Sequence, residues 1–155
     1  MKKKICLVLV ALICSVQVVR ALSEYEKKIV TTTVVLEAGG ENVNGRMAVL
    51  SVILNRADGK PSKMVDVVLK PKQFFCFNSL TRKRNPDYSF VIGKARRSRV
   101  WGSAYAMVER VCESPNTWPD LTGGATHYHA DYVSPYWKDS LNRTVKIGSQ
   151  IFYKD

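Results

Sequence analysis

The chain has 155 residues, and its 24 Lys and Arg outnumber its 13 Asp and Glu, which gives a net charge of +11 at neutral pH. A chain of this length forms a single compact domain as a rule, so a multidomain enzyme is excluded. Hydrophobic residues make up 46% of the chain and charged residues 24%. This balance excludes both a disordered tail protein and a polytopic membrane protein.

The N-terminus has the layout of a secretory signal peptide. Met1 to Lys4 are basic, Ile5 to Val19 are almost wholly apolar, and Val19-Arg20-Ala21 offers small side chains near a cleavage position. The apolar run is shorter than the roughly 20 residues that a helix needs to cross a bilayer. We expect a signal peptide at 1–21 and one domain at 22–155. An uncleaved anchor is the alternative, because Arg20 beside the cut is unusual.

Cleavage would remove four positive charges and lower the net charge from +11 to +7. An exported basic protein meets anionic partners on the envelope, such as wall polymers, lipopolysaccharide or phospholipid headgroups, and export argues against a nucleic-acid role. Two basic clusters would supply this attraction, and a plain solvated face is the other interpretation. The clusters are Arg82-Lys83-Arg84 and the group Lys94, Arg96, Arg97 and Arg99.

Two cysteines, Cys76 and Cys112, remain after cleavage. In an oxidising compartment an even pair is compatible with a disulfide, and equally with two buried free thiols.

The first helices are predicted from caps and apolar periodicity. Ser23-Glu24-Tyr25-Glu26 is a capping box, and the helix that it begins ends at Gly39-Gly40. A second, strongly hydrophobic helix opens at Asn44-Gly45 and ends at Asp58-Gly59-Lys60-Pro61. Ser62 is placed to cap a short third helix over residues 63–69.

The second half of the chain changes character. Residues 73–86 show no period and are predicted as a loop, whereas 95–113 return to helical spacing. Short strands are expected at 125–129, 144–147 and 150–153. Helices followed by strands predict an α+β domain with a small antiparallel sheet from the C-terminal third.

Glu37 is the first candidate for chemistry. It follows Val34-Val35-Leu36 in the last turn of the first predicted helix, just before two glycines. Apolar neighbours would desolvate the carboxylate and raise its pKa, as a general acid near neutral pH requires. An ordinary solvated glutamate is the competing interpretation.

Glu41 lies four residues after Glu37, but the intervening glycines are expected to displace it from the same helix face. Two carboxylates at this spacing are typical of a retaining glycosidase, where they lie roughly 5 Å apart. The alternative is that Glu41 caps the next helix near Asn44.

His127 and His129 are one residue apart, so on a strand they point to the same side. With Asp131 they would form a zinc site of an amidase or peptidase, but His-x-His alone is a weak signal. Ligand contacts or strand hydrogen bonds are the competing roles. Aromatic residues are dense nearby and would either stack on sugars or fill the core, namely Trp118, Tyr128, Tyr132, Tyr136, Trp137, Phe152 and Tyr153.

Six phrases, in this order, resemble the cell wall hydrolases of the SleB (spore-cortex-lytic enzyme) type. They are Glu37-Ala38-Gly39-Gly40-Glu41; Gly45-Arg46-Met47-Ala48-Val49 running to Leu54-Asn55-Arg56; Gln73-Phe74; Gly124-Ala125-Thr126-His127-Tyr128-His129-Ala130; Val133-Ser134-Pro135-Tyr136-Trp137; and Ile147-Gly148 with Ile151-Phe152-Tyr153.

The resemblance implies a small lysozyme-like domain that cleaves peptidoglycan glycan strands between N-acetylmuramic acid and N-acetylglucosamine. It implies a lytic transglycosylase with Glu37 as the single acid/base, exported to the periplasm or cell wall, with no metal or other cofactor. Residues of the family phrases are the candidates for binding the glycan or orienting Glu37, namely Glu41, Gln73, Thr126, His127, Tyr128 and His129.

Three positions depart from the family pattern. Leu36 stands where Gly is usual, Gly39 where a polar residue is usual, and Phe75 where a Ser commonly follows Gln-Phe. These changes make the site less polar and leave the preferred muramic acid modification open. Two other functions stay open from the sequence: a zinc-dependent amidase or peptidase using His127 and His129, and a non-catalytic peptidoglycan-binding module.

Overall fold

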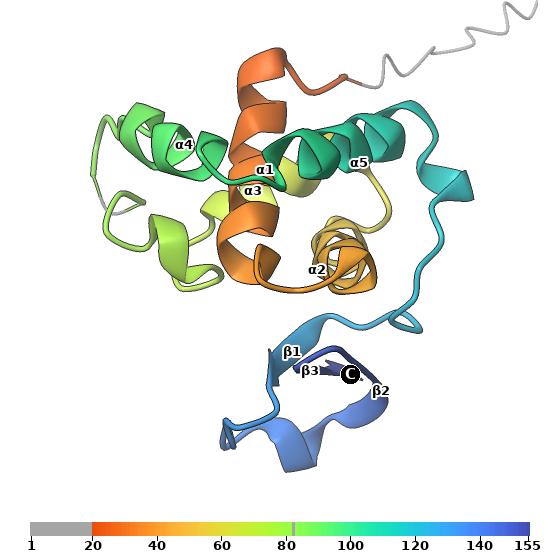
Figure 1. Ribbon diagram of the computed structural model, residues 1–155. Coiled ribbons are helices and arrows are strands. Elements are labelled where there is room, and N and C mark those ends of the chain that lie inside the picture. Colours follow the sequence, from red (N-terminus) through yellow and green to blue (C-terminus); the bar gives the residue numbers. More distant parts are fainter. Residues whose placement is uncertain (1–19, 82) are drawn as a thin grey trace, which may run out of the picture.

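The computed structural model describes residues 20–81 and 83–155, so residues 1–19 of the predicted signal peptide, and Arg82 of the first basic cluster, lie outside the described residues. Five α-helices are followed by a three-stranded sheet, which confirms the predicted α+β class (Figure 1). Across the described ranges, no helix is both long and apolar enough to span a bilayer. The elements are α1 (Glu24–Ala38), α2 (Val43–Arg56), α3 (Met64–Leu69), α4 (Ser89–Arg96), α5 (Trp101–Glu113), β1 (His127–Ala130), β2 (Asn142–Ile147) and β3 (Gln150–Lys154).

Helix α1 is the centre of the helical part, and α3, α4 and α5 pack around it (Figure 1). Its predicted capping box is present: the Ser23 amide donates to Glu26 Oε2 at 2.8 Å, and the Glu26 amide donates to Ser23 Oγ at 3.3 Å. The β-branched stretch is buried because each threonine hydroxyl donates to the carbonyl four residues earlier, as Thr31 does to Lys27 at 2.8 Å. The helix ends at Ala38, as predicted, with Glu37 in its last turn.

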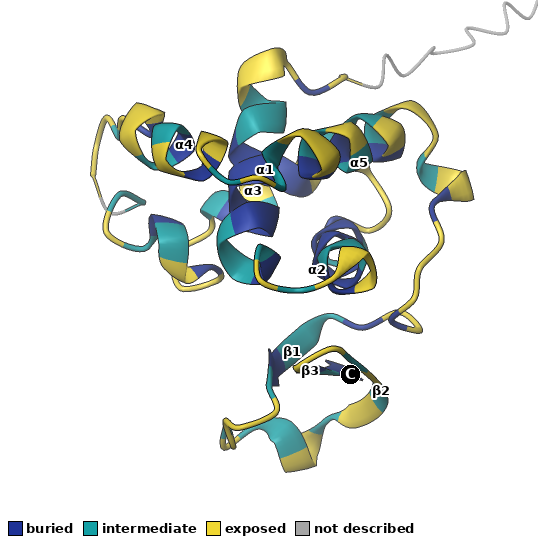
Figure 2. Cartoon of the chain, viewed as in Figure 1, coloured by how far each residue is buried: buried dark blue, intermediate teal, exposed yellow. Residues whose placement is uncertain are grey.

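Helix α2 is buried without a break over residues 48–54, as its hydrophobicity predicted (Figure 2). Its N-cap is Asn42, two residues before the predicted start, and the Asn42 side chain accepts from the Gly45 amide at 3.1 Å. One face of α2 packs into the helical core. The other face, with Ala48 and Val52, packs on Phe152 of the sheet, so α2 joins the two halves of the molecule.

Two helix predictions need correction. The segment 95–113 is not one helix: α4 begins at Ser89 and ends at Arg96, and α5 starts at Trp101 after a turn in which Ser98 Oγ accepts from the Val100 amide at 3.4 Å. Ser62 does not cap the third helix, because a 3-10 turn over Pro61–Lys63 leads directly into α3 without a side-chain cap. The predicted loop is confirmed over residues 73–81 and 83–86, and it contains a 3-10 turn at Phe75–Phe77.

The strands form an antiparallel sheet in the order β1-β3-β2, below α2 in Figure 1. The β1–β3 register pairs His127 with Tyr153 and His129 with Ile151. The segment that leads into the sheet is fixed to α2, since Asn55 Nδ2 donates to the Ala125 carbonyl at 3.0 Å.

Cys76 and Cys112 are free thiols and form no disulfide with each other. Of the two interpretations of the cysteines, the structure therefore agrees with free thiols.

Candidate functional site

The Glu37 side chain is half-buried and lines a cavity of about 690 Å³. The cavity lies between the last turn of α1, the 3-10 turn that follows Phe74, and α4. Its walls combine apolar rings with polar side chains, and they comprise Leu36, Phe75, Cys76, Asn78, Ser79, Phe90, Val91 and Lys94. Glu37 is therefore a carboxyl group beside open space, as a residue that acts on a bound ligand must be.

Burial raises the pKa of Glu37 above the ordinary value of a glutamate, as the apolar sequence around it predicted. Four weaker influences favour the carboxylate and limit this rise: a hydrogen bond from Tyr128, the backbone of Phe75 and of Cys76, and the charge of Arg56. The backbone contribution follows from the fold, because the first amides of a helical turn have no partner inside the turn. The carboxyl group thus holds a proton more readily than in water and has donors in place for its ionised form.

Two strands of the sheet, β1 and β3, form hydrogen bonds with Glu37. The Tyr128 hydroxyl of β1 donates to Glu37 Oε2 at 3.2 Å, and the Tyr128 ring packs on Phe152 with the centroids 5.7 Å apart. Gln150 of β3 donates from Nε2 to the Glu37 backbone carbonyl at 3.4 Å. The sheet therefore positions a residue that the chain places in the first helix, 91 positions before Tyr128.

Arg56, the last residue of α2, lies between Glu37 and a second cavity. Its Nε donates to the Thr126 carbonyl at 2.6 Å, and its guanidinium lies over the Phe74 ring, 5.4 Å from the centroid. Its Nη1 is buried and has no hydrogen-bond partner among the described residues. Burial is the main cause that lowers the pKa of His127, and the charge of Arg56 lowers it further. The same charge limits the rise in the pKa of Glu37.

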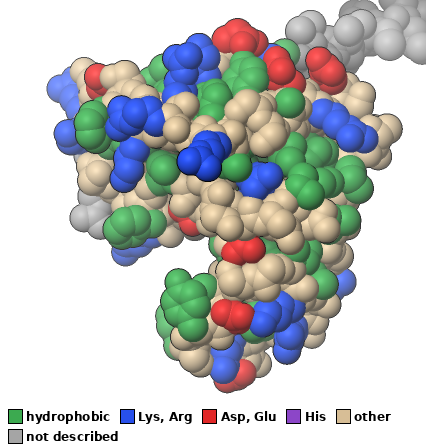
Figure 3. Space-filling view, viewed as in Figure 1, with side chains coloured by type: hydrophobic (Ala, Val, Ile, Leu, Met, Phe, Trp, Pro, Cys, Tyr) green, Lys and Arg blue, Asp and Glu red, His purple; other side chains and the backbone are tan. Residues whose placement is uncertain are grey.

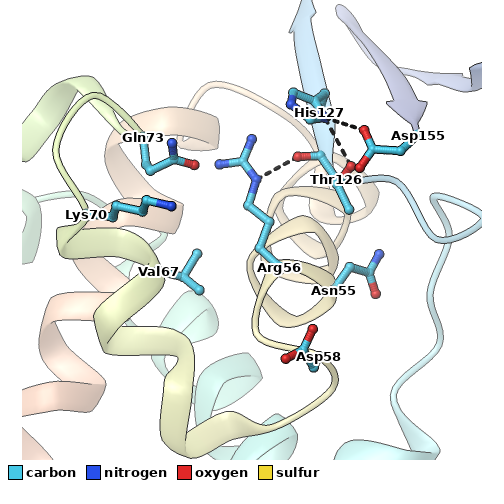
Figure 4. Close-up of a pocket in the computed structure, with 9 residues that line it drawn as sticks. All are labelled: Asn55, Arg56, Asp58, Val67, Lys70, Gln73, Thr126, His127 and Asp155. Carbon is cyan, nitrogen blue, oxygen red and sulfur yellow. Dashed lines mark hydrogen bonds and ion pairs between the residues drawn. The ribbon is translucent and has the colours of Figure 1, made fainter. Parts of the chain in front are cut away.

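The second cavity, of about 350 Å³, brings together three of the predicted site residues: Gln73, Thr126 and His127 (Figure 4). Gln73 reaches it from the loop after α3, Thr126 from the residue before β1 and His127 from the start of β1, and the Arg56 side chain extends between Gln73 and the other two. Thr126 Oγ1 and His127 Nδ1 are 3.0 Å apart. The structure thus gathers around one cavity residues that are separated by about fifty positions in the sequence.

His129 lies elsewhere, in an aromatic cluster on the sheet. Its Nδ1 is 2.7 Å from the Ala130 carbonyl and its Nε2 is 3.0 Å from the Tyr153 hydroxyl. His127 and His129 share a face, as the strand period predicted, and both rings contact Trp137, with centroids 5.4 and 5.7 Å away. Within residues 20–81 and 83–155, no three His, Cys, Asp or Glu side chains form a group that could hold a metal ion.

Glu41 is bound to the turn between β2 and β3. Its carboxylate accepts a hydrogen bond from the Ser149 hydroxyl and another from the Ser149 amide at 3.3 Å. Gly148 in this turn has a φ of 57°, and a side chain there would collide with the Glu41 carboxylate. The described bonds of Glu41 and His129 are thus internal, and their contact with substrate stays a prediction.

The late aromatic residues divide between core and surface. Trp118, Phe152 and Tyr153 are buried, whereas Tyr132 and Tyr136 are exposed.

Basic side chains gather on the surface around α4 (Figure 3). Lys83, Arg84 and the whole second cluster are exposed, and they form no ion pair with any described residue.

Comparison with known proteins identifies the family. The model of the family described as Cell Wall Hydrolase matches residues 40–153, which is most of the chain. The chain belongs to the cell wall hydrolase family. The matched stretch covers both cavities except for Leu36, Glu37 and the terminal Asp155, so Glu37 precedes it by three positions.

Solved structures give the same assignment over a longer part of the chain. The catalytic domain of the germination-specific lytic transglycosylase SleB from Bacillus anthracis is similar over 86% of this chain and 97% of that one, with a TM-score of 0.60 and 25% identity. The catalytic domain of the SleB protein from Bacillus cereus is similar over 87% of this chain and 94% of that one, with a TM-score of 0.56 and 25% identity. No curated protein matches the sequence.

Sequence reasoning missed three residues of this cell wall hydrolase that line the cavities. Arg56 stands in one of the phrases that carry the family resemblance, but nothing in its local sequence shows that it reaches Thr126, 70 positions later. Phe75 and Phe90 lie in stretches without periodicity or at a helix start, where a phenylalanine is expected to be buried. Two signals were available: Arg56 ends an apolar helix within a family phrase, and Phe75 stands where the family commonly has a Ser.

Proposed function

We propose that this protein cleaves the glycan strands of peptidoglycan between N-acetylmuramic acid and N-acetylglucosamine, as a lytic transglycosylase with Glu37 as its acid and base. The observation that carries the proposal is a half-buried carboxyl group whose pKa is raised by burial, beside a cavity of about 690 Å³, in a chain of the cell wall hydrolase family. The likeness to SleB catalytic domains supports the transglycosylase outcome.

In the first step, protonated Glu37 donates its proton to the glycosidic oxygen. The bond from that oxygen to the muramyl anomeric carbon breaks, and positive charge develops on the sugar ring. The carboxylate that remains is stabilised by the Tyr128 hydroxyl and by the charge of Arg56, both of which favour the ionised form. Burial makes the proton available near neutral pH, and these donors stabilise the carboxylate that its loss creates.

In the second step, the Glu37 carboxylate takes the proton from the muramyl 6-hydroxyl. That oxygen attacks the anomeric carbon and closes a 1,6-anhydro ring, so Glu37 ends the cycle protonated, as it began. Hydrolysis differs in that a water molecule takes the place of the 6-hydroxyl and leaves a reducing end. A single carboxyl group serves both steps.

The second cavity extends the substrate site along the glycan. Gln73, Thr126 and His127 offer an amide, a hydroxyl and an imidazole in the same 350 Å³ space. These groups are suited to the hydroxyl and acetamido groups of neighbouring sugars. Tyr128 orients Glu37, while Glu41 and His129 would act by fixing the sheet on which the cavity wall lies.

Peptidoglycan lies outside the cytoplasmic membrane, so this function requires export. The signal peptide predicted at 1–21 would supply it and would place the enzyme in the periplasm or in the cell wall. The exposed basic side chains around α4 are suited to the anionic envelope surface.

The test is a digest of purified sacculi followed by mass spectrometry of the released fragments. Wild-type protein should release anhydromuramyl ends, and Glu37→Gln should lower the rate at least about a hundredfold with binding to sacculi kept. Glu113→Gln, at the exposed end of α5, is the matched control and should keep the wild-type rate. Near-normal turnover by Glu37→Gln would exclude Glu37 as the acid, and freed peptides instead of sugar ends would exclude glycan cleavage.

A further inference from the structure

Two phenylalanine rings stand exposed in the cavity beside Glu37. The exposed fraction is 87% for Phe75 and 79% for Phe90, and both residues line the same 690 Å³ space. Full burial of a side chain of this size stabilises a protein by about 1.5–3 kcal/mol. Neither ring makes this contribution to the stability of the free protein, because both are exposed to water. An apolar wall beside a reactive carboxyl group is available to a ligand.

The fold holds both rings in the open position. Phe75 begins the 3-10 turn between Phe74 and Phe77, which are 3% and 0% exposed and therefore anchor the turn in the core on both sides. Phe90 stands on α4, which is fixed by the buried residues Ile92 and Ala95. The outward direction of each ring follows from the burial of its neighbours, so little order has to be gained when a ligand binds.

Lys94 gives the cavity a charge. It follows Phe90 by four residues on α4, so the two side chains share a face of the helix, and both line the cavity. The lysine is exposed and forms no ion pair with any residue of the described ranges. Asn78 and Ser79 add an amide and a hydroxyl to the same wall.

This combination selects a class of ligand. The C–H faces of a pyranose ring are apolar and stack on aromatic rings, whereas its edges carry hydroxyl and acetamido groups that need polar partners. An unpaired ammonium group adds a preference for a carboxylate. We propose that Phe75, Phe90 and Lys94 form a sugar subsite next to Glu37 that binds an N-acetylated amino sugar whose peptide substituent carries a carboxylate, as in a muramyl-peptide unit.

The subsite deepens the proposed function, on which the choice of a wall sugar rests, but it is tested by binding and not by turnover. The protein used is Glu37→Gln, which keeps the cavity shape. The probes are an N-acetylglucosamine tetramer, which has no carboxylate, and a peptide-bearing tetrasaccharide of alternating N-acetylglucosamine and N-acetylmuramic acid. Affinity is measured by isothermal titration calorimetry.

Phe75→Ala and Phe90→Ala should each weaken binding of both probes by about tenfold. Lys94→Gln should weaken the acidic probe alone and make its affinity less sensitive to salt. Tyr25→Ala removes a ring that is also exposed, at the other end of α1, and should leave both affinities unchanged. Unchanged melting temperatures of the phenylalanine variants would show that the fold is intact, as their exposure predicts.

Wild-type affinity of both phenylalanine variants for both probes would overturn the subsite. Equal weakening of the two probes by Lys94→Gln would overturn the assignment of the carboxylate to Lys94. Full turnover by Glu37→Gln would refute the catalytic proposal and leave these binding results unaffected, so the two failures are distinguishable.

Discussion

Replacing Tyr128 with Phe tests the hydrogen bond that joins the sheet to Glu37. The variant keeps the ring packed on Phe152 and removes the hydroxyl that lies 3.2 Å from Glu37 Oε2. Hydrogen bonds to charged groups contribute about 1.5–3 kcal/mol, and this one is long for an O–H donor, so about 1.5 kcal/mol is the appropriate value. The same free energy in the transition state corresponds to a roughly tenfold loss of kcat.

The pH profile separates this effect from a general loss of activity. The Tyr128 hydroxyl favours the ionised form of Glu37, so its removal raises the pKa of Glu37 further above the ordinary value. In the proposed mechanism the proton is donated by protonated Glu37, so activity should be lost as the pH rises through the pKa of Glu37. The alkaline limb of the profile should therefore move to higher pH in Tyr128→Phe.

The assay is the initial rate of muropeptide release from sacculi across a pH series. Tyr25→Phe, which alters an exposed tyrosine at the far end of α1, is the control and should reproduce the wild-type profile. An alkaline limb that stays in place or moves to lower pH in Tyr128→Phe would refute the reasoning, because the hydroxyl would then not act on the carboxyl group that limits the rate.

Four other predictions follow from described contacts. Glu41→Gln weakens the bonds from Ser149 and should lower the melting temperature by about 4 °C for roughly 1 kcal/mol lost, as followed by circular dichroism; an unchanged value would contradict the structural role. Arg56→Gln removes a charge that lowers the pKa of Glu37, so the alkaline limb of the activity profile should move to higher pH, and a shift to lower pH would exclude this coupling. Burial, together with the charge of Glu37, raises the pKa of the Cys76 thiol to about 12, so iodoacetamide near neutral pH should modify it only after denaturation, as mass spectrometry of the native protein would check. Because burial raises the folded-state pKa of Glu37, its contribution to stability is full below the unfolded value and is lost as the pH rises through the folded value; Glu37→Gln should therefore have a higher melting temperature than wild type at neutral pH and lose this advantage in acid, and equal melting temperatures at both pH values would contradict the shift.

Local signals in the chain predicted the helix that carries Glu37. Its start follows from reciprocal hydrogen bonds between Ser23 and Glu26, which are three residues apart. Its end follows from two consecutive glycines, and the apolar residues before Glu37 predicted the direction of its pKa shift. Interactions of this kind act within one or two turns, so a single sequence contains everything that they need.

Helix α4 could not be recognised in the same way. Its eight residues include Gly93 and three basic or polar residues. Of the eight, only Ile92 and Ala95 are buried. Such a short helix is stabilised mainly by packing on α1 and not by its own propensity. The apolar period that continues into α5 therefore predicted one helix where the chain forms two.

The surroundings of Glu37 depend on contacts between distant parts of the chain. Tyr128 comes from β1, Arg56 from the end of α2, and the open rings of Phe75 and Phe90 from a 3-10 turn and from α4. No periodicity relates these residues, because their proximity arises when α2 packs between the helical core and the sheet. The residues of the chain thus settle which carboxyl group is placed at a helix end among apolar neighbours. Long-range packing settles which donors, charges and rings surround it. These groups come together only when the core between the helices and the sheet has formed, and no local pattern in the sequence encodes that packing.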